Sequence, residues 1–421
     1  MSCSVTSERS CVVWISLPGG AGPVPCGALT VDQTGRNTNA EFTYGPRYLA
    51  RADAISLDPI HLPLRAASFK ADHLFCAIRD AAPDRWGRKV LELRHAALKY
   101  NEFGELPELE YLLKSAGDRV GALAFTEDAS APPTLPTRIS MSGLADAIHA
   151  VETGRAVTQA QGALLTGSLG GARPKSAYQD AKASMILKFG RQDDRFDQVR
   201  VEKAMLDMAA ACGFDVPERE FVEVDGTTAL GIHRFDRERI KGQHYPRHYL
   251  SAKTLLGQYG ETEIGSYPAF ADELRRWSDQ PARDCHELFG RMLFNIATGN
   301  CDDHAKNHGV LHAGGTTYRL APAFDLVPMP QVSTTWRQAM IVGLRGQDSD
   351  FANALTVVQH FMLEADAGKA IARRVGKTVS AWRKFFASAR VSKRDTEYVQ
   401  ACFDVGRLAV SPFRSLSNRN R

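Results

Sequence analysis

The chain has 421 residues, of which 44% are hydrophobic and 24% charged, as is typical of a globular protein with two or three domains. Its net charge of +4 is too small to indicate nucleic-acid binding by itself, and its eight cysteines form no C-x-x-C pair, which argues against a zinc site or a disulfide framework. No apolar run approaches ~18 residues and no signal peptide is recognisable, so we expect a cytoplasmic protein with no membrane-spanning segment.

The first predicted domain covers residues 1–130. Residues 12–17 predict a strand, and Trp86 introduces a segment with helical periodicity. Three prolines within residues 132–136 indicate a semi-rigid linker or crossover. We therefore expect a small α/β domain at this end of the chain.

The second predicted domain covers residues 137–248 and mixes strands with a helix. Residues 183–189 predict a strand, and residues 198–211 place apolar side chains on one helical face. The pair Asp225-Gly226 between two apolar runs is a strong hairpin signal. These elements together predict a β-rich lobe.

A glycine-rich segment, GSLGGARPK (167–175), stands just before the predicted strand at 183–189. Glycines let a backbone approach phosphate oxygens closely, and Arg173 and Lys175 add positive charge. The spacing is not that of a Walker A motif. The segment is therefore either a phosphate-binding loop or a flexible surface turn.

Two further features of this domain could bind a nucleotide. Lys188 lies in the apolar strand, where a lysine can reach phosphates, and Glu202 on the next helix could pair with it. The alternatives are an edge-strand lysine that points to solvent and a solvated glutamate. The segment HRFDR (233–237) either contacts a nucleotide base through backbone groups or closes its hairpin with an Arg–Asp pair.

The third predicted domain covers residues 249–421 and is mostly helical. Asp284 and Glu287 match a D-x-x-E variant of the capping box ahead of a helical apolar pattern, and Gly299 ends that helix. A hairpin then returns the chain, so that Asp325 is expected close to the loop that follows the helix.

That loop, DDHAKN (302–307), carries the strongest functional signal. Asp302 stands five positions before Asn307, as in the protein kinase catalytic loop, and Asp325 follows. A phosphotransferase needs one carboxylate to accept a hydroxyl proton, and an amide and a carboxylate to hold Mg²⁺. We expect His304 to hydrogen-bond within the loop, because a dinuclear hydrolase would need more histidine and carboxylate clusters. Taken alone, the pattern is also that of a polar loop of turn formers.

In this order the motifs resemble those of the HipA-family serine/threonine kinases, the toxins of bacterial type II toxin–antitoxin pairs. The resemblance rests on SLGGARPK (168–175), the strand with Lys188, HRFDR (233–237), DDHAKN (302–307) and AFD (323–325), together with PDRWGR (83–88) and DRVGAL (118–123) in the first domain. It implies an α+β fold, in which a two-lobed protein-kinase-like core follows the small α/β domain. The first lobe would be β-rich, the second helical, and the cleft between lobes is a natural nucleotide site.

The resemblance also implies roles for individual residues. Asp302 would be the catalytic base, and Asn307 and Asp325 would complete the catalytic set and hold Mg²⁺. Ser168 matches the autophosphorylated serine, whose phosphate switches the kinase off. The implied cofactors are ATP and Mg²⁺. The implied ATP-binding residues are Gly170, Gly171, Ala172, Arg173, Pro174, Lys175, Lys188, His233, Arg234, Phe235, Asp236, His304, Lys306, Asn307, Phe324 and Asp325.

For partners, the resemblance implies a HipB-like helix-turn-helix antitoxin, with DNA contacted only indirectly through it. It also implies a protein substrate, such as an aminoacyl-tRNA synthetase, whose phosphorylation arrests growth. Two alternatives stay open: a catalytically weak scaffold that binds the antitoxin and assists operator repression, and a small-molecule phosphotransferase. Cys301 departs from the small or polar residue expected before Asp302 and is either a reactive thiol or a packing residue.

Overall fold

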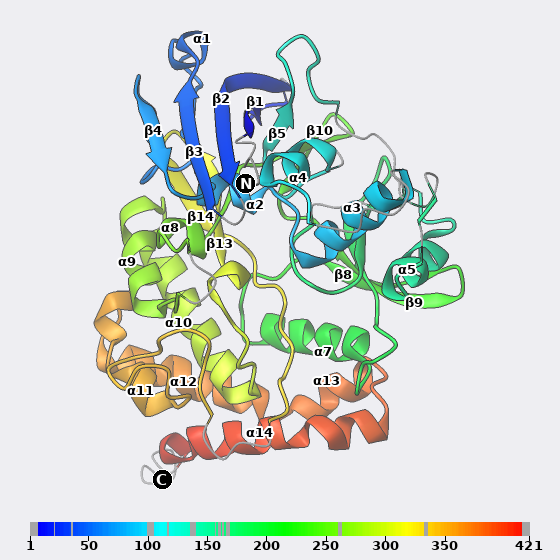
Figure 1. Cartoon of the computed structure of the whole chain (residues 1–421). Coiled ribbons are helices and arrows are strands. Elements are labelled where there is room, and N and C mark those ends of the chain that lie inside the picture. Colours follow the sequence, from blue (N-terminus) through cyan, green and yellow to red (C-terminus); the bar gives the residue numbers. More distant parts are fainter. Residues whose placement is uncertain are drawn as a thin grey trace, which may run out of the picture. The chain divides into compact units, whose positions relative to one another are not determined.

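The computed structural model (Figure 1) describes residues 7–20, 22–34, 37–98, 105–115, 118–134, 140–155, 157–158, 161, 164–165, 169–259, 263–331 and 336–414. Ser168 and the end of the proline-rich linker therefore lie outside the described residues. The chain divides into two compact units. The first comprises Met1–Arg191, Arg219–Leu250 and Gly314–Thr316, and the second comprises Gln192–Glu218, Ser251–Ala313 and Thr317–Arg421.

The first unit begins with an antiparallel five-stranded sheet in the order β4-β3-β2-β1-β5. Its strands are β1 (Ser7–Ser16), β2 (Pro23–Thr34), β3 (Asn37–Tyr44), β4 (Ser68–Ala71) and β5 (Leu123–Thr126). The short helices of this region are α1 (Pro46–Leu49), α2 (Cys76–Asp80) and α4 (Glu108–Lys114). Val13 and Ile15 alternate along β1 into the hydrophobic core, which confirms the strand predicted at residues 12–17.

A second antiparallel sheet, in the order β6-β7-β9-β8, lies in the same unit. Its strands are β6 (Lys175–Gln179), β7 (Ser184–Lys188), β8 (Arg219–Val224) and β9 (Thr227–His233). Helices α3 (Arg85–Leu98) and α5 (Leu144–Glu152) pack on one face of it, through a core that includes Trp86, Ile148 and Leu187 (Figure 1). Since Leu187 faces this core, its neighbour Lys188 belongs to the opposite face of the sheet.

The turn between β8 and β9 has the geometry that its sequence predicts. Asp225 and Gly226 both have positive φ, 48° and 80°, as the two central residues of a type I′ hairpin require. A further hairpin, β10 (Arg237–Ile240) with β11 (Gln243–Pro246), follows β9 directly.

The second unit is mostly helical. Its helices are α7 (Gln198–Ala211), α8 (Ala252–Leu255), α9 (Tyr267–Trp277), α10 (Pro281–Thr298), α11 (Phe351–Leu355), α12 (Ala365–Val379), α13 (Trp382–Ser388) and α14 (Lys393–Arg414), with 3-10 turns η1 (Ala305–Asn307) and η2 (Val358–Phe361). Strands β12 (Tyr249–Ser251), β13 (Gly309–Gly314) and β14 (Thr317–Leu320) form a small sheet. Helix α10 packs against α9, α12 and α14 and is the central element of the unit. Helix α7 matches the helix expected at residues 198–211, although it packs here rather than with the rest of the expected second domain.

The capping box predicted at Asp284 and Glu287 is wrong. Helix α10 begins at Pro281, whose fixed φ suits a first helical position, so Asp284 lies inside the first turn. The Asp284 carboxylate instead accepts hydrogen bonds from Ser278 Oγ at 2.7 Å and from the Leu320 backbone N–H at 2.8 Å. It therefore ties α10 to β14 rather than capping the helix.

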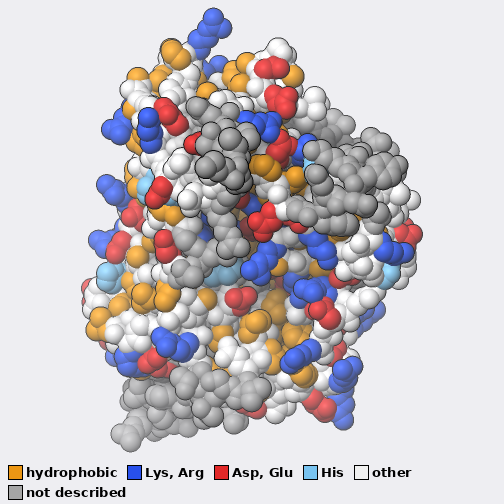
Figure 2. Space-filling model, in the orientation of Figure 1, with side chains coloured by type: hydrophobic (Ala, Val, Ile, Leu, Met, Phe, Trp, Pro, Cys, Tyr) orange, Lys and Arg blue, Asp and Glu red, His pale blue; other side chains and the backbone are white. Residues whose placement is uncertain are grey.

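The described surface is of mixed charge. Basic and acidic side chains are interspersed on the face that Figure 2 shows, in keeping with the small net charge. Among the described residues, no helix is both long and apolar enough to cross a membrane.

Candidate catalytic loop and phosphate-binding residues

The loop that follows α10 is held at both ends by backbone hydrogen bonds. Gly299 caps the helix with φ of 62°, where a Cβ would lie 2.8 Å from Trp336 Cζ3, so both conformation and space favour glycine. The Ala339 N–H then donates to the Cys301 carbonyl at 2.9 Å, and the Ala252 N–H donates to the His308 carbonyl at 2.8 Å. The intervening residues 302–307 therefore start and end at fixed points.

Asp303 anchors this loop from the inside. Its side chain is 1% exposed, and its Oδ2 accepts hydrogen bonds from the Tyr267 hydroxyl, from Asn295 Nδ2 at 2.7 Å and from His308 Nε2 at 2.7 Å. The Asn295 side chain is itself fixed by Asn300 Nδ2 at 3.0 Å. A buried carboxylate is stable only when such donors surround it. We did not predict this role for Asp303, because its donors Tyr267 and Asn295 come from other parts of the chain.

Asp302, the expected catalytic base, is solvent-exposed while Asp303 beside it is buried. Nearby protein atoms partly desolvate its carboxyl group, and this raises its pKa above the ordinary value. Repulsion from Asp325 and Asp303 also raises the pKa, whereas His304 opposes the shift. The charges of His304 and Asp325 therefore lie close enough to the Asp302 carboxyl group to act on its pKa.

Asn307 and Asp325 are the expected Mg²⁺ ligands, and amide and carboxylate oxygens are the protein donors that this cation takes. Asn307 is 8% exposed, and its Nδ2 donates weakly to the Asp302 carbonyl at 3.4 Å, which leaves Oδ1 as the atom for a cation. Asp325 is half-buried and has a φ of 58°, a left-handed conformation that aspartate adopts more readily than most non-glycine residues. Mutually repelling carboxylates and an amide oxygen fit Mg²⁺, which takes one or two protein oxygens and completes its shell with phosphates and water.

The described residues contain no group of three or more His, Cys, Asp or Glu side chains arranged to hold a metal ion. Three further residues of this region were expected to bind ATP: His304, Lys306 and Phe324. The His304 carbonyl accepts from the Asn307 N–H at 2.8 Å, and Lys306 and Phe324 are half-buried.

In the first unit, the described part of the glycine-rich segment forms a bent loop ahead of β6. Gly170 and Gly171 both have positive φ, 69° and 76°, which explains the two consecutive glycines. The Lys175 ammonium group donates back to the Gly170 carbonyl, and the Pro174 carbonyl accepts from the Phe189 N–H at 3.0 Å. Ala172 and Arg173 lie at the outer end of the loop, where Ala172 is exposed.

Two of the predicted phosphate-binding lysines lie directly opposite each other. Lys175 on β6 pairs in register with Lys188 on β7, so both side chains project from the same face of the sheet. Lys175 is only 7% exposed and Lys188 is half-buried. The register thus gathers positive charge beside the glycine-rich loop.

The segment 233–237 holds a buried network of ion pairs. The Arg234 side chain is fully buried, and it pairs with Asp118 and Asp236, each at 2.7 Å. Asp236 also pairs with Arg237 at 3.1 Å and accepts from the Gly121 N–H at 2.9 Å. The side chains of Arg234 and Asp236 are therefore taken up by an ion network that ties β9 to the segment before β5, as in the structural alternative.

The other two residues expected here remain more open. Phe235 lies against the Tyr249 ring, with 6.2 Å between ring centroids, and His233 lies 3.6 Å from an exposed Glu220 carboxylate. A contact of this segment with a nucleotide would depend on its backbone or on Phe235 and His233. The assignment of residues 233–236 to ATP binding stays a prediction.

Two further expectations concern single residues. Glu202 is 6% exposed on α7 in the second unit, whereas Lys188 belongs to the first, and their pairing stays a prediction. Cys301 is buried, and desolvation, with a smaller contribution from Asp302, raises the pKa of its thiol to about 12. A thiol that stays protonated at neutral pH is a poor nucleophile, so the packing role is favoured over the reactive one.

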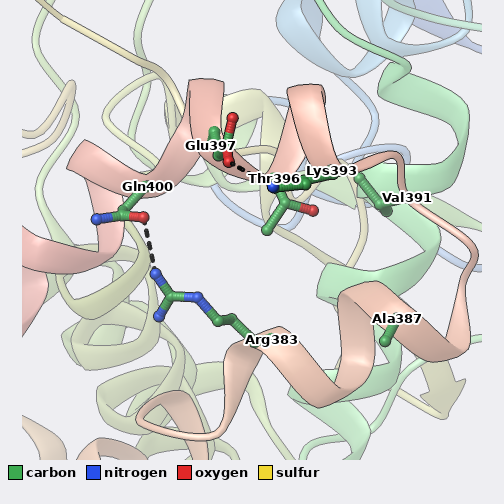
Figure 3. Close-up of a pocket in the computed structure, with 7 residues that line it drawn as sticks. All are labelled: Arg383, Ala387, Val391, Lys393, Thr396, Glu397 and Gln400. Carbon is green, nitrogen blue, oxygen red and sulfur yellow. Dashed lines mark hydrogen bonds and ion pairs between the residues drawn. The ribbon is translucent and has the colours of Figure 1, made fainter.

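A cavity of about 400 Å³ lies between α13 and α14 (Figure 3). It is lined by Arg383, Ala387, Val391, Lys393, Thr396, Glu397 and Gln400. Arg383 donates to Gln400 Oε1 across it at 2.8 Å. None of the predicted site residues lines this cavity. Its ionisable lining residues are Arg383, Lys393 and Glu397.

Two family models match the chain: one described as the HipA N-terminal domain covers residues 21–126, and one described as the HipA-like C-terminal domain covers residues 167–382. A putative kinase of Sinorhizobium fredii, Y4mE, is 28% identical over 345 residues, which cover 76% of this chain and 79% of that relative. A putative kinase of Haemophilus influenzae is 26% identical over 144 residues, or 31% of this chain and 42% of the relative.

Among solved structures, the fold resembles HipA of Shewanella oneidensis in its complex with HipB and operator DNA. The TM-score is 0.68 and the identity 16%, over 97% of this chain and 99% of that chain. The similarity confirms the expected fold, a kinase-like α+β core with a small N-terminal domain.

Proposed function

The chain belongs to the HipA family, and from this premise we propose that it is an ATP- and Mg²⁺-dependent serine/threonine kinase that acts as a growth-arresting toxin. The description of two relatives as putative kinases supports the catalytic part of the proposal. The single observation that carries it furthest is the catalytic loop itself. Asp302 is exposed for chemistry while its neighbour Asp303 is buried and fixes the backbone.

In this proposal Asp302 accepts the proton of a serine or threonine hydroxyl. A raised pKa makes a carboxylate a better proton acceptor, provided that it is still ionised at the working pH. Fixed ends of the loop keep the carboxylate in place without a rearrangement during the reaction. Asn307 and Asp325 would hold Mg²⁺, which when bound supplies charge neutralisation on the transferring phosphoryl group.

The phosphates of ATP are assigned to the glycine-rich loop and to the lysine pair. Lys175 and Lys188 share one face of their sheet, which supports this assignment because it places two positive charges beside the glycine-rich loop. Lysine binds phosphate as a point charge, so two lysines from neighbouring strands can serve different oxygens of one chain of phosphates.

The regulation and the partners belong to the same proposal. Autophosphorylation of Ser168 would place about two negative charges in the loop meant for ATP phosphates and so switch the enzyme off. The Shewanella relative was solved with HipB and operator DNA, which supports a HipB-like helix-turn-helix antitoxin as the partner. A translation component such as an aminoacyl-tRNA synthetase is the proposed substrate class.

The direct test is incubation of the purified full chain with Mg²⁺ and γ-labelled ATP, followed by mapping of the label. We expect label on Ser168, absent from Ser168→Ala and reduced by at least about 10²-fold in Asp302→Asn. Asp366→Asn is the matched control, because Asp366 is an exposed aspartate of the same unit that pairs only with Lys369 among the described residues. No transfer by a wild-type chain that binds ATP would favour the scaffold, and transfer to small molecules alone would favour the small-molecule phosphotransferase.

A further inference from the structure

The start of α3 holds the glycine-rich loop through a single glycine. The Gly171 N–H donates to Asp84 Oδ2 at 2.8 Å, and the Gly171 carbonyl accepts from the Trp86 N–H at 3.2 Å. Both backbone polar groups of one loop residue are therefore bound by residues that belong to the N-terminal domain model, 21–126. The two partners are separated by 87 positions in the sequence, so this contact is built by the fold.

The two residues that hold Gly171 are themselves held by further contacts. The Trp86 ring is 5% exposed, packs with Leu187 in the core beneath the sheet, and donates from Nε1 to the Lys175 carbonyl at 2.9 Å. The Asp84 carbonyl accepts the first helical hydrogen bond of α3, from the Arg88 N–H at 2.8 Å. The backbone that carries the Asp84 carboxylate is thus fixed by the helix on one side and by Trp86 on the other.

An anchor of this kind lowers the entropy cost of ordering more for a glycine-rich loop than for other loops. Glycine loses more conformational freedom on ordering than any other residue, and Gly170 and Gly171 both adopt positive φ here. When the loop is ordered before the ligand arrives, the ligand does not have to supply that ordering free energy. The Gly171 N–H is already used by Asp84, so phosphate contact falls to the neighbouring backbone and to the lysine pair.

We propose that Asp84 is a positioning residue that holds the glycine-rich loop ready for the phosphates of a nucleoside triphosphate through its bond to Gly171. The N-terminal domain thereby sets the nucleotide affinity of the kinase core. This inference rests on the proposed function, since it names what the loop binds. It assigns Asp84 no contact with the nucleotide and no part in proton transfer.

The test compares ATP binding and phosphoryl transfer by the full chain with Asp84→Ala, Asp84→Asn and Asp84→Ser. Alanine removes the acceptor for the Gly171 N–H, and we expect the KM and Kd for ATP to rise about tenfold, with kcat unchanged within about twofold. Asparagine retains an acceptor of the same length and is expected to restore affinity near that of the wild type. Serine can cap a helix as aspartate does, but its side chain is too short to reach the Gly171 N–H. If anchoring of the loop sets ATP affinity, Asp84→Ser is expected to raise the KM and Kd for ATP as Asp84→Ala does.

Hydrogen exchange of peptides that cover residues 169–175 provides a readout independent of activity. We expect faster exchange there in Asp84→Ala and wild-type exchange in Asp72→Ala, an exposed aspartate of the same domain that pairs with His73. If the wild type binds ATP, then equal or tighter binding by Asp84→Ala, or a fall in kcat with KM unchanged, overturns the inference. If the wild type itself neither binds nor uses ATP, the proposed function fails instead, and the exchange data still report whether Asp84 anchors the loop.

Discussion

Substitution of Asp303 by alanine tests the claim that this buried carboxylate organises the catalytic loop. The change leaves the Tyr267 hydroxyl, Asn295 Nδ2 and His308 Nε2 without their common acceptor. A buried donor left unsatisfied costs about 1–3 kcal/mol, so three of them lower the free energy of unfolding by roughly 3–6 kcal/mol after partial relaxation. Tyr267→Phe removes only one donor and is expected to cost about 1 kcal/mol.

The assay is native-state hydrogen exchange in increasing denaturant, read on peptides that cover residues 295–308. A local readout is needed because a chain with two compact units does not unfold as one two-state system. Asp366→Asn serves as the control and is expected to match the wild type. A loss of less than about 1 kcal/mol in Asp303→Ala, or an equal loss in Tyr267→Phe, would refute the assignment of Asp303 as the anchor.

The other predictions use the same approach. Arg234→Ala leaves Asp118 and Asp236 as buried carboxylates with fewer counter-charges, and we expect the first unit to lose about 3–5 kcal/mol, measured by denaturant-dependent exchange of its peptides. Burial alone would raise the pKa of Asp236, but the charges of Arg234 and Arg237 lower it overall below its ordinary 3.8. The stability from this group is therefore present above about pH 4 and lost as the pH falls further, so an acid titration of Asp236→Asn should show a shallower loss than the wild type. The raised pKa of Asp302 has the opposite sign: its ionised form disfavours the folded state at neutral pH, so Asp302→Asn should melt at an equal or higher temperature without Mg²⁺, and a lower melting temperature would contradict the shift.

Elements with strong local signals could be predicted from the sequence. The periodicity at residues 198–211 and the pair Asp225-Gly226 each correspond to an observed element, α7 and the turn between β8 and β9. These features depend on residues that are neighbours in the chain. The loop at residues 302–307 could also be recognised as a motif, because its spacing is short and its residue types are chemically specific; its catalytic role stays a prediction.

The features that could not be predicted depend on contacts between distant segments. Asp284 was predicted to cap a helix, but that helix begins earlier, at Pro281. The Asp284 carboxylate instead accepts a hydrogen bond from the Leu320 N–H in a later strand. The burial of Asp303 depends on its contact with Tyr267, and the role of Asp84 depends on its contact with Gly171. Neither contact can be read from the sequence. Sequence spacing gives no information on which polar groups become buried together.

The central claim is that this chain arrests growth through a phosphoryl transfer in which Asp302 accepts the substrate's proton. It is tested most directly by induced expression of the full chain in bacteria. Wild type, Asp302→Asn and the control Asp366→Asn should be produced to equal soluble levels, which the expected stability of the Asp302 variant favours. We predict growth arrest by the wild type and by Asp366→Asn, and normal growth with Asp302→Asn. Arrest by Asp302→Asn at equal protein level would contradict the account and show that toxicity does not depend on this carboxylate.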